Sequence, residues 1–139
     1  MAITAHQFRN FAEHLLKSEI PNLNDAATTV NCALLDTVPT GTEDVWQDIN
    51  ANEITGDNYT AGGKEIGNKS VTESGGTATF DCNDINWPNS TIDARAAVLY
   101  EESTGILITY IDFGETKTSD NGDFRVKWND SGLFTAAII

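Results

Sequence analysis

Short apolar segments alternate with turn residues through the second half of the chain, and this pattern restricts the fold more than any other feature. Segments rich in β-branched and aromatic residues are followed at regular spacing by groups of Gly, Asn, Asp and Ser. The strand candidates are Ser70 to Thr72, Thr77 to Cys82, Ala94 to Tyr100, Ile106 to Phe113, Phe124 to Trp128 and Leu133 to Ile138. The series predicts a mainly β, antiparallel β-sandwich-like domain.

Two of the connecting segments carry specific predictions. The segment "NDINWPNSTID", from Asn83 to Asp93, is expected to be the turn that leads into the strand beginning at Ala94. Asn121-Gly122 is typical of a tight hairpin turn, because both residues tolerate positive φ. It lies within "GETKTSDNGD", which is expected to connect two strands, as is the shorter "EESTG".

Side-chain alternation within the strand candidates predicts core positions. Every second residue of a strand points to the same face, so two segments each place three apolar residues together. The resulting core candidates are Ala78, Phe80, Cys82, Phe124, Val126 and Trp128. "ILITYIDF", from Ile106, lacks alternation and is expected to be a central strand covered on both faces. Cys32 and Cys82 could form a single disulfide, but both lie in strand-like segments, which favours free thiols that behave as small apolar side chains.

The N-terminal segment predicts one amphipathic helix. Thr4 and Gln7 form a capping-box pattern, and Pro21 sets the other end, so the helix is expected over residues 4–20. Its apolar stripe consists of Phe8, Phe11, Ala12, Leu15 and Leu16. The stripe either packs on the domain core or contacts another protein.

The remainder of the chain is expected to belong to the same domain, which spans residues 1–139, with a β-rich body over residues 28–139. Thr28 to Thr37 is typical of a strand buried on both faces toward its end. Residues 38–70 have loop chemistry, with Gly, Asn and Asp scattered throughout. A loop of this length is uncommon in a compact domain, so we expect a short strand or turn around Val45 to Asn50, or a functional loop.

The charge balance restricts the partners. The chain has 21 Asp and Glu residues against 8 Lys and Arg, a formal net charge of -13. Such a surface is repelled by phosphate backbones, so nucleic acid is not expected as a partner. No segment has the length and apolarity of a membrane span, and the N-terminus does not resemble a signal peptide, so we expect no membrane partner and a protein made in a cytoplasm.

No catalytic or metal-binding motif is present. The two histidines, His6 and His14, lie near no Ser or Cys in any nucleophile motif, so an enzyme is not expected. The Asp and Asn residues of "DCNDIN" and "SDNGD" do not fit an EF-hand, and ordinary turns explain them better than calcium. We therefore expect no catalytic, cofactor-binding or metal-binding residues and no cofactor. Trp46 and Trp87 remain candidates for a sugar-binding platform, although Trp87 before a proline is more typical of a plug at the end of a sandwich.

Four blocks of the chain carry a resemblance to known proteins. They are "YTAGGKEIGNKSVT" from Tyr59, "ATFDCNDINWPNSTIDARAAVLY" from Ala78, "LITYIDFGETKTSDNGDFRVKW" from Leu107 and "GLFTAAI" near the end. These blocks resemble the small virion structural proteins of tailed bacteriophages, a family that includes capsid decoration and cement proteins. Their order and spacing match the family, and the block around Trp87 is the most specific. The chain departs from the family at Cys82, where a small residue is usual, and in the short "EESTG" turn.

The resemblance implies a non-enzymatic structural protein on the outer surface of a capsid. Its partners would be the major capsid protein and copies of itself, with a trimer as one arrangement, and the host would be bacterial. The contact candidates are Phe8, Phe11, Leu15, Trp46, Trp87 and Phe134. They lie in the N-terminal helix, the 38–63 loop, the turn around Trp87 and the C-terminal segment. The alternative is a tail- or fibre-associated module that binds host-surface glycans through Trp46 or Trp87.

Overall fold

The computed structural model describes residues 4–128 and 132–137 and has a mainly β fold. Its strands form a five-stranded sheet in the order β1-β7-β6-β2-β3 and a three-stranded sheet in the order β4-β5-β8, with antiparallel pairing throughout. The strands are β1 (Thr4–Gln7), β2 (Val30–Leu35), β3 (Lys64–Glu65), β4 (Ser70–Ser74), β5 (Thr77–Asp81), β6 (Ile85–Glu101), β7 (Leu107–Val126) and β8 (Phe134–Ala137). The helical elements are α1 (Phe11–Leu16) and two 3-10 turns, η1 (Trp46–Asp48) and η2 (Asn50–Asn52). The predicted β-sandwich-like class is confirmed.

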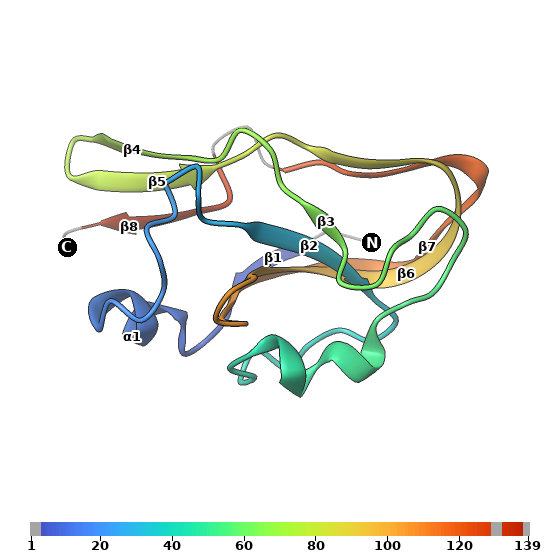
Figure 1. Ribbon diagram of the computed structural model, residues 1–139, viewed down its shortest axis with the longest axis horizontal. Coiled ribbons are helices and arrows are strands. Elements are labelled where there is room, and N and C mark those ends of the chain that lie inside the picture. The colour runs from blue at the N-terminus through green and yellow to red at the C-terminus, as the bar shows by residue number, and fades with distance from the viewer. Residues whose placement is uncertain (1–3, 129–131, 138–139) are drawn as a thin grey trace.

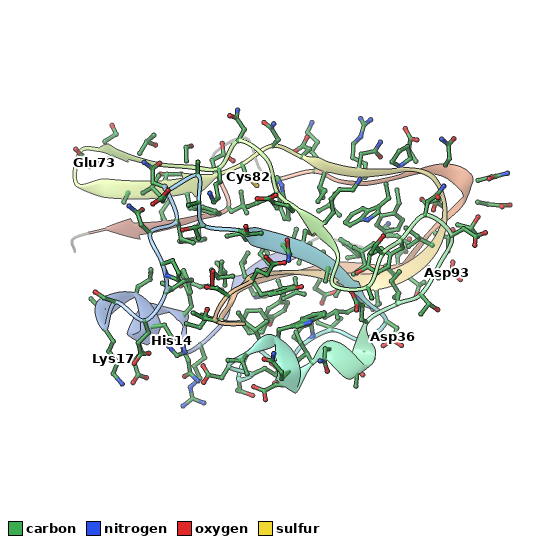
Figure 2. All side chains as sticks on the ribbon, in the orientation of Figure 1. His14, Lys17, Asp36, Glu73, Cys82 and Asp93 are labelled. Atoms are coloured by element: carbon green, nitrogen blue, oxygen red, sulfur yellow. The ribbon has the colours of Figure 1, made fainter. Side chains whose placement is uncertain are left out.

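A ribbon made of β6 and β7 organises the molecule. The two strands have 17 and 20 residues and pair from Ile85 opposite Val126 to Tyr100 opposite Leu107. Figure 1 shows the ribbon running along one layer, turning at one end of the molecule and returning across the opposite layer. Asp93 lies at this bend (Figure 2). The sandwich therefore arises largely because one long hairpin folds back on itself.

Burial along the ribbon changes at the bend. From Ile85 to Ala94, β6 largely alternates between buried and exposed side chains, whereas Ala96 to Glu101 are all buried. β7 has the reverse order, with a buried first part and an alternating second part. The outer half of the ribbon thus has one face in solvent, and the inner half is covered on both faces. The prediction that Ile106 to Phe113 is a central strand is confirmed.

Two predicted turns are strand instead. Residues 85–93 belong to β6, and residues 114–123 belong to β7. Asn121 does adopt positive φ (55°), but it lies in an irregularity of the ladder between the pairs Ser90–Gly122 and Ile92–Ser119, so the predicted Asn121-Gly122 hairpin is wrong. Positive φ suits a β-bulge as well as a two-residue turn, and pairing with a distant strand selected the bulge.

The predicted helix over residues 4–20 is wrong in its extent. Thr4 to Gln7 form strand β1, which pairs with Thr109 to Asp112 of β7, and α1 contains only Phe11 to Leu16. The His6 ring stacks on Tyr110 with 5.0 Å between ring centroids. Strand pairing along β7 thus satisfies backbone groups that a capping box would satisfy only locally. The tertiary partner outweighed the local signal.

The long 38–70 loop covers the outer face of the five-stranded sheet (Figure 1). Its turn at η1 and η2 confirms the turn expected near residues 45–50. The Trp46 ring lies parallel to that of Tyr100, with 4.6 Å between centroids. The backbone N–H of Trp46 donates to the carbonyl of Gly105. This covering layer explains why the inner half of the ribbon and β2 are buried on both faces.

The predicted core positions divide according to what covers them. Phe80, Phe124, Val126 and Trp128 are buried, whereas Ala78 and Cys82 are only half-buried. Ala78 lies in β5 beside an open groove, so alternation there does not lead to full burial. Both cysteines are free thiols, as expected, and Cys32 is completely buried in β2. Burial raises the pKa of Cys32, and it raises the pKa of Cys82 to about 12.

Candidate partner-contact surface

The structure separates the six predicted contact residues into two groups. Phe8, Phe11 and Trp87 are at most 2% exposed, so the core accounts for them. Leu15 is 36% exposed, and Trp46 and Phe134 are half-buried against the core. Leu15 and Phe134 line the same groove, whereas Trp46 lies in the 38–70 loop. Only the groove therefore brings predicted contact residues together.

This groove, the apolar groove, lies between α1 with its following turn and the three-stranded sheet. It encloses about 450 Å³. Its apolar lining consists of Leu15, Ile20, Pro21, Leu23, Val71, Ala78, Phe80 and Phe134. Figure 1 shows α1 beneath β4, β5 and β8 at one end of the molecule. The groove is thus built from segments far apart in the sequence.

Aromatic packing shapes one wall of the apolar groove. Strand register places Phe80 opposite both Val71 and Phe134, so these side chains form a row across the small sheet. The Phe80 and Phe134 rings stack with 5.2 Å between centroids. Phe11 meets Phe134 edge-on at 5.1 Å, which joins α1 to the sheet. The row is fixed by core contacts on one side and open to solvent on the other.

Large apolar side chains are exposed beside this groove. In the described part of the chain, these are Leu15 (36%), Leu16 (89%) and Val71 (39%). Leu16 was predicted to belong to the apolar stripe of the helix, but α1 ends there and only Phe11 of the helix is buried. Sequence reasoning missed Val71, although an apolar residue flanked by Ser70, Thr72 and Glu73 could have drawn attention. Leu15 of α1 and Val71 of β4 thus add exposed apolar surface to the lining of the apolar groove.

His14 fixes α1 to the 38–70 loop. Its Nδ1 lies 2.5 Å from Glu19 Oε2, and its Nε2 lies 2.6 Å from Asp44 Oδ1. The contact with Asp44 is the main cause of a raised pKa for His14, and the Glu19 contact adds to it against the opposing effect of burial. A doubly protonated imidazolium donates to both carboxylates. His14 therefore holds the helix against the loop through both of its ring nitrogens.

A second polar network orders the 38–70 loop around Glu53. The Tyr59 hydroxyl donates to Glu53 Oε2 at 2.7 Å, and the Gly62 N–H donates to the same oxygen at 2.7 Å. The Tyr59 hydroxyl also accepts from the Leu34 N–H, while the Tyr100 hydroxyl donates to the Gly62 carbonyl. Burial raises the pKa of Tyr59. The network attaches the loop to β2 and β6.

The two tryptophans differ in what they could offer a sugar. Trp87 is 2% exposed and packs between Tyr59 and Phe124, with Lys64 Nζ 5.6 Å from its ring centroid. Its ring is therefore a core plug, as the neighbouring proline suggested. Trp46 is half-buried, and Tyr100 covers one of its faces.

The buried carboxylate of Glu101 serves the turn that joins β6 to β7. Glu101 is 1% exposed and accepts hydrogen bonds from the backbone and hydroxyl groups of Ser103 and Thr104. Burial alone would raise the pKa of Glu101, but these donors hold it below its usual value. All of the donors lie within three residues. The carboxylate thus caps the turn that follows it.

Within residues 4–128 and 132–137, no group of three or more His, Cys, Asp or Glu side chains is arranged to hold a metal ion. In the same ranges no helix has both the length and the apolarity to cross a bilayer.

No protein-family model matches the chain, and no curated protein or solved structure is significantly similar to it, so the resemblance to phage virion proteins stays a prediction.

Proposed function

We propose that this protein is a non-enzymatic decoration or cement protein of a tailed bacteriophage, bound to the outer surface of the shell formed by the major capsid protein. It would be made in the bacterial cytoplasm and incorporated into the virion, where copies of the protein also contact one another. It would stabilise the shell by joining neighbouring subunits.

The observation that carries this proposal is the apolar groove with its exposed margin. Monomeric proteins seldom leave a contiguous apolar surface open, and such surfaces commonly bind other proteins. Leu15 and Val71 line the groove, and together with Leu16 they are the large apolar side chains exposed among the described residues. The net charge of -13 suits a position outside the shell, away from packaged DNA.

The alternative of a tail module that binds glycans has less support. A sugar platform needs an aromatic face open to solvent, which Trp87 lacks and Trp46 offers on one side only. A tail module would be present in few copies per particle, whereas a cement protein would match the copy number of the major capsid subunit.

The test compares particles assembled with and without the protein. Copy number is measured by quantitative gel electrophoresis of purified particles, and shell rupture is measured on heating and in low salt. The proposal expects a copy number close to that of the major capsid subunit and earlier rupture without the protein. A handful of copies per particle, or unchanged rupture, would contradict it.

A matched pair of variants tests the groove. Val71 lines the apolar groove, and its neighbour Thr72 is exposed on the opposite face of β4. Val71→Asp should reduce binding to protein-free shells about tenfold or more, because it places a charge against an apolar contact. Thr72→Asp should bind as the unmodified protein does. Equal binding by both variants would show that the groove is not the contact surface.

A further inference from the structure

A second groove, the cationic groove, gathers positive charge on this acidic protein. The whole chain has 8 Lys and Arg residues, and three of them, Lys117, Arg125 and Lys127, line one hollow of about 400 Å³. Apart from Lys127, which directly follows β7, all of its lining residues belong to β7. The groove therefore lies along the edge of the sandwich formed by β7, on the side away from β6.

The fold of the ribbon builds this groove. Because β7 turns back at the bend (Figure 1), both of its halves line the hollow, the first with Ile111 and Phe113 and the second with Phe124 and Val126. The Phe113 and Phe124 rings lie with 6.2 Å between centroids. These four side chains are at most 5% exposed and form an apolar floor. An adjacent hollow of about 440 Å³ shares Ile111 and Lys127, so the depression continues along the same edge. The result is an elongated groove with a charged rim.

The backbone of β7 is unpaired along this edge. β1 pairs only with Thr109 to Asp112, and β6 occupies the other side of β7. Among the described residues, no strand pairs with the outer edge of β7 from Phe113 to Val126. An unpaired edge presents alternating N–H and C=O groups, which can accept an added strand.

The positive charges on the rim of the cationic groove are only partly neutralised by neighbouring carboxylates, so they can attract an anionic ligand. Arg125 and Lys127 are exposed, and neither forms an ion pair within the described part of the chain. Lys117 Nζ lies 3.1 Å from Glu115 Oε1, and Asp123 also lines the hollow, so the rim is not uniformly positive. Three cations and one carboxylate in the lining still give a net positive groove on a strongly negative protein.

We propose that the cationic groove binds an extended, acidic segment of a partner protein, which adds a strand to the outer edge of β7. Its backbone would pair with the Phe113 to Val126 edge, and alternate side chains would enter the groove. Carboxylates would reach Lys117, Arg125 and Lys127, while small apolar side chains would contact the floor. This inference does not depend on a role in a capsid.

Other occupants fit the observations less well. Nucleic acid would be repelled by the net charge of -13, and three cations offer few phosphate contacts. A second copy of the chain carries the same net charge and meets the same long-range repulsion. Lysines on a free edge can also simply prevent strand aggregation. That role requires no apolar floor, which is the feature that favours a peptide ligand.

Synthetic peptides test the proposal with the full chain. The probe alternates Glu and Val over about eight residues, enough to follow the edge at roughly 3.3 Å per residue. A second peptide replaces each Glu with Lys, and a third replaces alternate residues with Pro to remove backbone donors. Binding is measured by fluorescence anisotropy, and backbone amide NMR locates the site. Only the Glu-Val peptide should bind, with shifts concentrated between Phe113 and Lys127.

A matched pair of variants tests the cationic rim. Arg125→Glu together with Lys127→Glu should weaken peptide binding about tenfold, the effect expected for losing two exposed ion pairs. Arg9→Glu together with Lys17→Glu makes the same change in net charge outside the groove, at two exposed residues, and should leave binding unchanged. Circular dichroism and thermal unfolding confirm that both variants fold.

Several results would overturn the proposal. Equal binding of the proline peptide would mean that charge alone attracts the ligand, without strand addition. Tighter binding of a single-stranded oligonucleotide would indicate a general polyanion site. If reversal of Arg125 and Lys127 changed the oligomeric state of the protein alone, in sedimentation, the occupant would be a second copy. An absence of peptide binding would leave the lysines as edge protection only.

Discussion

At the scale of single residues, His14 links α1 and the turn after it to a loop thirty positions away. Both ring nitrogens contact carboxylates, those of Glu19 and Asp44. The ring is mostly covered, with a side-chain exposure of 17%. The raised pKa of His14 means that the folded protein holds this proton more tightly than the unfolded chain. The contact therefore stabilises the fold only while the ring is charged.

The pH dependence of stability should reveal this contact. Because the folded pKa is raised, its contribution is fully present below the unfolded value of about 6.5 and is lost as pH rises through the folded pKa. The free energy of unfolding, from urea titrations, should fall over that range in the unmodified protein. In His14→Gln the free energy of unfolding should fall less over the same pH range than in the unmodified protein.

His6→Gln is the matched control, because His6 stacks on Tyr110 and contacts no carboxylate in any described ion pair. It should retain the pH dependence of the unmodified protein. The same slope in all three proteins would show that His14 is not the titrating group. Sequence reasoning placed His14 within the predicted helix and missed its partner, because Asp44 lies in a segment with no periodicity.

At the scale of elements, the bulge at Asn121 determines how β7 follows β6. Asn121 has φ of 55°, its side chain is exposed, and its N–H donates to Thr91 Oγ1 at 3.2 Å. The sequence indicated positive φ at Asn121, which the structure has, and at Gly122, which it does not, and assigned both to a hairpin turn. An Asn with positive φ suits a hairpin turn and a β-bulge equally well, so only the pairing with the partner strand distinguishes the two.

Substitution at the bulge should separate backbone strain from loss of contacts. Asn121→Val should lower the free energy of unfolding by about 1–2 kcal/mol, because a β-branched residue is strained at positive φ. Asn121→Gly should change it by no more than about 0.5 kcal/mol. Chemical denaturation provides the measurement.

Asp120→Val is the control for the bulge, since Asp120 is exposed next to it and does not have positive φ. This substitution should change the free energy of unfolding only slightly. If Asn121→Val were equally harmless, the ladder would have shifted register to remove the bulge.

At the scale of the whole molecule, the reactivity of the Cys32 thiol measures how often the core opens. It lies in β2, between the ribbon and β3, and is completely buried. A thiol reagent reaches such a group only when the structure around it opens. If the two layers and the covering loop unfold together, the opening that exposes Cys32 is global unfolding.

Thiol labelling should therefore measure global stability. In a Cys82→Ser variant, the opening free energy from labelling of Cys32 should equal the free energy of unfolding from denaturant, about 5–15 kcal/mol for a domain. In Cys32→Ser, the half-buried Cys82 should react through a smaller opening. A lower value for Cys32 would mean that β2 opens separately.

The sequence by itself determined the β class and the central strand at Ile106 to Phe113, and it favoured free thiols over a disulfide. Hydrophobic periodicity and turn chemistry are local, so they can be read one segment at a time. It also identified Leu15 and Phe134 of the apolar groove. It could not identify the groove as a site, because α1 and β8 lie at opposite ends of the chain.

Only the tertiary structure decided how the segments pair. It joined residues 85–101 and 107–126 into one folded ribbon, turned Thr4 to Gln7 into an edge strand, and placed Lys117 beside Arg125 and Lys127. Each result depends on backbone hydrogen bonds or packing between residues far apart in the chain. The free energy of these contacts outweighs small local preferences, and no local pattern records which distant strand will supply them.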